Sequence, residues 1–326
     1  RGAVVTARSE GRLGVVPAGL SAAAAVLATT TSLVGLLSAW PYAAETASWR
    51  LQAYGQDLGN LLAVVVLVAG LLTARRGSVR GGQVWAGALV YLAYAFVIYA
   101  MTVHFTALFL AYVAVLGLSV YSLVFALPGR PELRLPRRVR RLGAGVLGAT
   151  AVAFALLWLS AILGALAAGR PPADLAEAGL PANPVHVIDL ALVLPGMLIV
   201  AVRSRRGGLA AALLAPLLVF AALMAASIVV TLLLGGAPAA VVAVLAAVAL
   251  VSAVLAGLLL RDGSAEHRAE FGEGLALQVG ELALLRVGDP AGERDVEDAQ
   301  RDLSGEDGPA LVRAAVGERS DRGGLQ

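Results

Sequence analysis

Apolar residues gather in long runs that are separated by short polar segments. Eight such runs cover residues 15–39, 58–74, 83–102, 105–127, 142–168, 185–202, 209–234 and 239–260. About 20 apolar residues cross the ~30 Å hydrocarbon core of a bilayer, and only 58–74 and 185–202 are shorter than that. Since lipid offers backbone groups no hydrogen-bond partner, runs of this kind must be helical. The pattern therefore predicts an all-α fold, a polytopic transmembrane helix bundle with eight spans.

The first run follows a short basic segment that contains Arg1, Arg8 and Arg12. A basic start followed by an apolar core is also typical of a signal peptide, whose core has only about 7–15 residues. The run at 15–39 is longer than that. We therefore expect a retained first span, with a cleaved signal peptide as the alternative.

Arginine is distributed unevenly among the segments between the runs. Fifteen arginines lie in the segments 1–12, 75–81, 128–141 and 203–208. The remaining connections hold only Arg50 and Arg170. Eight spans place all the basic segments on one side, and the positive-inside rule makes that side the cytoplasm. We therefore predict a multi-pass protein of the plasma membrane with both termini in the cytoplasm.

Composition divides the chain into two parts. The sequence is 59% hydrophobic and 14% charged, with a mean hydropathy of +0.82, whereas soluble domains carry about 25% charged residues. Residues 1–260 hold 17 arginines against 7 acidic residues, and residues 261–326 hold 8 against 15. We predict a transmembrane domain over 1–260 and an acidic cytoplasmic tail over 261–326, mostly disordered because it is charged and poor in aromatic residues.

The order of connections repeats after the fourth span, which suggests halves at 1–127 and 142–260 joined by a basic linker at 128–141. In the second span Asp57 precedes a basic Arg-Arg-Gly turn, and in the sixth span Asp189 precedes a similar turn. Because each half has an even number of spans, such halves are parallel and related by an axis along the membrane normal. Short basic turns are common in membrane proteins, so the alternative that the chain contains no duplication stays open.

Several chemistries are excluded or lack their usual signals. The sequence has no cysteine and no lysine, which excludes disulfides, thiolate metal sites and a retinal Schiff base. No phosphate-binding loop or Ser/His/Asp grouping is present. We predict no cofactor and no nucleic-acid partner. Whether the chain is an enzyme stays open, and the missing catalytic groupings favour a protein without enzyme activity. His104 and His186 are both expected near the external side. They leave a haem- or metal-using oxidoreductase component as an alternative, although zinc needs further ligands that the sequence does not group.

Two acids are the main candidates for function. Asp189 lies inside an apolar run, and an intramembrane acid is a functional candidate by default. The alternative is that Asn183 caps the helix, Pro184 occupies its first turn, and Asp189 is solvated near the interface and stabilised by the helix dipole. Asp57 can similarly be read as the N-cap of the second span.

A parallel repeat places Asp57 and Asp189 at similar depth, where they are expected to face one external cavity. The other polar side chains expected around that cavity are Asn60, His186, His104 and Tyr94. We interpret the chain as a transporter or ligand-binding membrane protein whose partners are the lipid bilayer and a small ligand or cation, with a homo-oligomer possible. A structural or assembly protein without a catalytic site is a further alternative.

Two stretches carry a resemblance. They run from Ala93-Tyr94-Ala95-Phe96 through His104 to Tyr112, and from Pro184 to Pro195-Gly196. They resemble a family of uncharacterised polytopic membrane proteins of GC-rich bacteria, and the likeness covers spans two to seven. The resemblance implies the membrane class and brings no activity, substrate or cofactor.

The arginine distribution generates a test of topology. Since the sequence has no cysteine, single cysteines can be introduced and labelled from either side of the membrane. We expect external labelling at positions 50, 104, 177 and 237, and cytoplasmic labelling at 78, 135, 206 and 290. External labelling at position 290 would contradict the predicted orientation.

Overall fold

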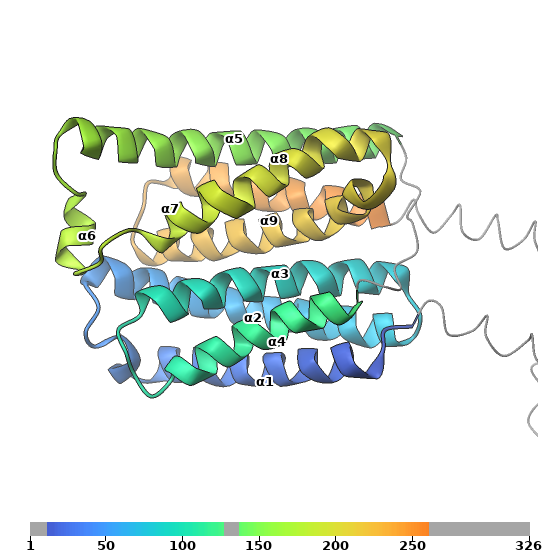
Figure 1. Cartoon of the computed structure of the whole chain (residues 1–326), viewed down its shortest axis with the longest axis horizontal. Helices are drawn as coiled ribbons and strands as arrows, with labels where there is room; N and C mark the ends of the chain where they lie inside the picture. Colours follow the sequence, from blue (N-terminus) through green and yellow to red (C-terminus); the bar gives the residue numbers. More distant parts are fainter. Residues whose placement is uncertain (1–11, 127–136, 261–326) are drawn as a thin grey trace, which may run out of the picture. The chain divides into compact units, whose positions relative to one another are not determined.

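The computed structural model describes residues 12–126 and 137–260, which form helices and contain no strand (Figure 1). The elements are α1 (Val15–Leu37), η1 (Trp40–Tyr42), α2 (Ala47–Arg75), α3 (Val79–Thr102), α4 (Phe109–Ala126), α5 (Arg137–Ala167), α6 (Ala173–Glu177), α7 (Pro184–Ile188), a π-helical segment η3 (Asp189–Val193), α8 (Leu194–Arg203), η4 (Ser204–Arg206), α9 (Gly208–Leu234) and a final helix (Ala239–Leu260). Eight helical segments are long and apolar enough to cross a membrane, with Pro184–Arg206 as one of them. The all-α bundle of eight spans is confirmed, and the chain is a multi-pass membrane protein.

The chain divides into two compact units, Arg1–Ser264 and Ala265–Gln326. All described helices belong to the first unit. The basic lead, most of the linker 128–141 and the acidic tail 261–326 lie outside the described residues. Their predicted properties stay predictions.

Helix α2 is longer than the sequence pattern predicted. The sequence pattern begins the second span at residue 58, but α2 begins at Ala47 and Thr46 is its N-cap, accepting a hydrogen bond from the Trp49 backbone at 3.3 Å. Asp57 is therefore about 15 Å along the helix at 1.5 Å per residue, and its interpretation as an N-cap is wrong. The polar residues between Ala47 and Asp57 belong to a helix whose other face meets protein.

The helices pack as two groups of spans. Helices α1 to α4 form a closed ring in which α1 contacts α2 and α4, and α3 contacts α2 and α4. In the second group α5 packs on α8 and α9, and α8 packs on α9. The two groups appear as separate layers in Figure 1. We call them the first half and the second half.

Helix α9 makes most of the contact between the halves, because it packs against both α2 and α3, while α3 also meets α7. In a parallel repeat α3 corresponds to α9, and α2 corresponds to the sixth span. The α3–α9 contact then lies on the axis that relates the two halves. The same axis makes the α3–α7 contact the counterpart of the α2–α9 contact. The α2–α9 contact is much the larger of that pair, and the duplication itself stays a prediction.

Two glycines allow α2 and α9 to approach closely. A Cβ at Gly55 would lie 2.8 Å from the Thr231 Cα, and one at Gly59 would lie 2.6 Å from the Ser227 Cβ. Small residues spaced by four let membrane helices pack at short distance. The Ser227 hydroxyl also donates to the Gly55 carbonyl at 3.3 Å. The spacing of these two glycines is visible in the sequence, but the close approach was not predicted from it.

The close approach generates a test with a matched control. Gly59→Ala adds a methyl group against Ser227 and Tyr91 and is expected to destabilise the bundle by about 1–3 kcal/mol, as overpacking does. Gly117→Ala on α4 meets nothing within 4 Å and is expected to be neutral or stabilising by up to ~1 kcal/mol. Thermal unfolding of the purified full chain in detergent measures both. Equal melting temperatures for the two variants would contradict the account.

Candidate functional site

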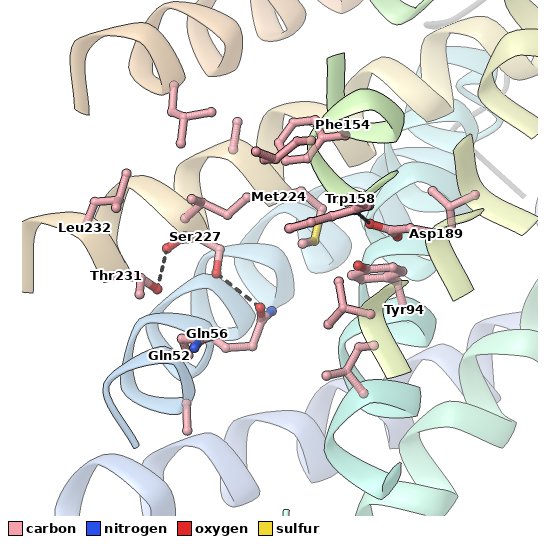
Figure 2. Close-up of a pocket in the computed structure, with 18 of the residues that line it drawn as sticks. Gln52, Gln56, Tyr94, Phe154, Trp158, Asp189, Met224, Ser227, Thr231 and Leu232 are labelled. Carbon is pink, nitrogen blue, oxygen red and sulfur yellow. Dashed lines mark hydrogen bonds between the residues drawn. The ribbon is translucent and has the colours of Figure 1, made fainter. Parts of the chain in front are cut away.

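A cavity of about 950 Å³ lies between the halves and is lined by α2, α3, α5, α7, α9 and the final helix (Figure 2). It is at the upper end of the size range of small-molecule sites, roughly 300–1,000 Å³. Its lining includes Glu45 before α2, Gly235 after α9 and Met197 on α8. The cavity therefore begins at the end of the bundle opposite the arginine-rich loops, which we call the arginine-poor end, and extends between the spans.

The wall is mostly apolar and has a few polar groups. The apolar lining includes Ile98, Phe154, Leu157, Val193, Phe220, Met224, Ile228, Leu232 and Val244. The polar lining includes Glu45, Gln52, Gln56, Tyr94, Asp189, Ser227 and Thr231. Small-molecule sites in proteins combine apolar walls and a few placed polar groups in this way.

Asp189 begins a π-helical turn in the sixth span. The Leu194 backbone N–H donates to the Asp189 carbonyl, a bond across five residues, and Pro195 directly after it has no N–H to continue an α-helical ladder. π-turns of this kind are frequent at functional sites. Asn183 caps α7 by accepting from the Val185 backbone at 2.9 Å, with Pro184 in the first turn, as predicted.

The Asp189 side chain is buried rather than solvated, because only 6% of the residue is exposed. Trp158 on α5 donates its indole N–H to the Asp189 Oδ2 at 2.8 Å, and the Tyr94 side chain on α3 lies beside the same carboxylate. The His186 ring packs on Trp158 with centroids 4.7 Å apart, and Tyr94 meets Phe220 edge to face at 5.6 Å. One neutral donor from the second half therefore fixes the carboxylate at the cavity wall, beside a tyrosine of the first half, as Figure 2 shows.

Asp57 lies at a different place, inside the first half. It is 1% exposed, and it accepts hydrogen bonds from the hydroxyls of Tyr42 at 2.8 Å and Tyr99 at 2.9 Å. It is not among the residues that line the cavity, whereas its neighbour Gln56 is. Successive residues of a helix point about 100° apart, so Gln56 faces α9 while Asp57 faces α1. The expectation that Asp57 and Asp189 share one cavity does not agree with this placement.

The tyrosine donors of Asp57 are themselves held in place. Burial raises the pKa of the Tyr42 hydroxyl above its ordinary value, and the nearby Asp57 carboxylate raises it further. Tyr42 therefore stays protonated and donates. Tyr99 lies between the two sites, since its ring lines the cavity while its hydroxyl reaches Asp57 and the Ala53 carbonyl.

The remaining predicted site residues are dispersed. Asn60 is buried in the first half and donates to the Ser32 hydroxyl at 3.1 Å. His104 is tied to Glu45, which accepts from its backbone N–H at 2.8 Å and lies 3.0 Å from its Nδ1. His186 lies in the second half, on Trp158. Among the described residues, no three His, Asp or Glu side chains meet in a group suited to a metal ion.

Gln56 and Trp158 were not among the predicted site residues. The Gln56 amide donates to the Tyr91 hydroxyl at 2.6 Å, and its carbonyl oxygen accepts from Ser227 at 3.4 Å (Figure 2). Gln56 precedes the apolar run at 58–74, so the hydrophobic pattern did not place it within a span. Trp158 had one usable signal, since a tryptophan inside an apolar run carries an N–H that needs a partner when buried.

Comparison of the chain with protein-family models, with curated proteins and with solved structures found no significant match. We therefore infer the function from the geometry of the cavity. The resemblance of spans two to seven to a family of uncharacterised polytopic membrane proteins of GC-rich bacteria stays a prediction.

The Asp57 contacts generate a second test. Tyr99→Phe removes the hydroxyl that reaches Asp57 and is expected to destabilise the chain by about 1–3 kcal/mol, because a buried acceptor loses its donor. Tyr121→Phe is the matched control, since Tyr121 is 58% exposed on α4 and its ring contact with Phe125 survives the change. Thermal unfolding in detergent measures the difference. A Tyr99→Phe variant as stable as Tyr121→Phe would show that the bond is not stabilising.

Proposed function

We propose that this chain is a ligand-binding membrane protein of the transporter type, in which a small, largely apolar molecule occupies the cavity between the two halves. The observation that carries the proposal is the cavity of about 950 Å³ whose apolar wall contains one buried acid, which Trp158 of the second half holds beside Tyr94 of the first half. Many transporters bind substrate at the interface of two repeated halves.

The interface between the halves supports movement as well as binding. Its main contact is the α2–α9 crossing, which small residues at Gly55 and Gly59 bring close together. Alternating access in transporters is largely a rigid-body rocking of one half against the other. The arginine distribution supports an orientation in which the arginine-poor end, and with it the beginning of the cavity, faces outward while both termini are cytoplasmic.

The oxidoreductase alternative receives less support from the geometry. It requires His104 and His186 to serve one centre, whereas His104 pairs with Glu45 at a loop and His186 packs on Trp158 in the second half. A structural role needs no cavity at all. The transporter-type proposal uses the cavity, the acid and the division into halves together.

The proposal is tested with the purified full chain in detergent, by screening small molecules for those that raise its melting temperature. A ligand at about 100 times its Kd adds ~2.7 kcal/mol of stability to the state that binds it. Met224 lies on the cavity wall, and Met224→Trp is expected to abolish the shift by filling the cavity. Leu163→Trp on α5, where the leucine is 60% exposed, is the control and is expected to retain it. A shift that survives Met224→Trp would contradict the proposal.

A further inference from the structure

We propose that the cavity takes an amphipathic organic cation, whose charged group lies beside Asp189 and whose apolar body lies along α9. This inference rests on the proposed function, because it names the class of ligand for the same cavity. It depends on four features of the lining, which are its charge, the free capacity of the Asp189 carboxylate, the surrounding rings and the scarcity of oxygen ligands.

The charge of the lining excludes anions. Its two ionisable acids are Glu45 and Asp189, and it includes no arginine or histidine. In the described part of the chain no arginine forms an ion pair with Asp189, and the titratable side chain that acts on it electrostatically is His186, which does not line the cavity. A buried carboxylate attracts positive charge strongly because the surroundings screen it poorly. Since Glu45 is already engaged by His104, Asp189 is the acid left for a ligand.

The Asp189 carboxylate retains acceptor capacity. A carboxylate offers about four acceptor positions on its two oxygens, and Trp158 is a neutral donor that supplies one hydrogen bond without charge. This bond fixes the direction of the carboxylate. An ammonium group of a ligand fits such a site because it supplies both the missing charge and further donors.

Aromatic rings surround the acid. Trp158 contacts Phe154 with centroids 5.9 Å apart, and Tyr94 contacts Phe220. All four residues line the cavity, and Figure 2 shows both Trp158 and Tyr94 next to Asp189. Aromatic faces attract cations through their quadrupole, and cages of such rings recognise quaternary ammonium groups.

An inorganic ion suits the lining less well than an organic one. Calcium takes six to eight oxygen ligands and magnesium six, whereas no three acidic or histidine side chains meet at Asp189 in the described residues. Most of the rest of the wall is apolar and includes Ile98, Met224 and Val244. Burying an apolar body there contributes roughly 25 cal/mol for each Å² removed from water. The ligand class that uses both the acid and the wall is the amphipathic organic cation.

The experiment compares two probes that share a shape and differ in the sign of their charge. Tetraphenylphosphonium and tetraphenylborate each carry four phenyl groups around one central atom. Saturable binding of each is measured by equilibrium dialysis with the full chain in lipid nanodiscs, against empty nanodiscs as the blank. Asp189→Asn removes the charge at the cavity. Asp57→Asn is the matched control, because that acid is sealed inside the first half.

We expect saturable binding of tetraphenylphosphonium, no saturable binding of tetraphenylborate, and a Kd at least tenfold higher in Asp189→Asn but not in Asp57→Asn. The comparison of the two probes on the unchanged chain needs no variant to fold. Absence of saturable tetraphenylphosphonium binding, equal binding of both probes, or an unchanged Kd in Asp189→Asn would overturn the assignment of a cation.

A third variant separates failure of this assignment from failure of the proposed function. If tetraphenylborate binds and Met224→Trp abolishes its binding, the cavity remains the ligand site and only the cation is overturned. If saturable binding of either probe is unaffected by Met224→Trp, the cavity is not the site, and both proposals fail.

Discussion

The crossing of α2 and α9 determines how the two halves of the bundle meet. Gly55 and Gly59 leave no side chain between the helices, so Ser227 and Thr231 lie directly against the α2 backbone. This contact orients Gln56 toward Ser227. The contact between the halves is concentrated on α9. The neighbouring spans of the two halves therefore do not pack against each other along their whole length, and a space remains between them. The cavity is the space that remains between α2 and α3 on one side and α5, α7 and the final helix on the other.

The chain stabilises two buried acids in different ways. Asp57 is enclosed by the first half and receives both of its tyrosine hydrogen bonds there, which makes it a link between η1, α2 and α3. Asp189 stands at the wall of the cavity, where Trp158 on α5 donates to it and Tyr94 on α3 lies beside it. Acids in the membrane are costly and usually face the interior of a bundle or a polar cavity. The same residue type thus serves packing in one half and, in our proposal, ligand recognition between the halves.

The hydrophobic pattern was enough to predict the eight spans, since length and apolarity decide whether a helix crosses a bilayer. It was not enough to place the start of α2, because Gln56 is a polar residue that faces protein rather than water. The predicted repeat put both acids at similar depth facing one cavity, but depth does not determine the direction in which a side chain points about its helix. Partners distant in sequence, such as Trp158 with Asp189, become visible only when the helices are packed.

The distinction between the two acids is the central claim, and chemical modification tests it directly. Dicyclohexylcarbodiimide is an apolar reagent that modifies carboxyl groups it can reach within a membrane protein. Treatment of the full chain followed by peptide mass spectrometry is expected to show modification at Asp189, through the cavity, while Asp57 stays unmodified behind Tyr42 and Tyr99. Modification of Asp57 as fast as Asp189, or of Asp57 alone, would contradict the account.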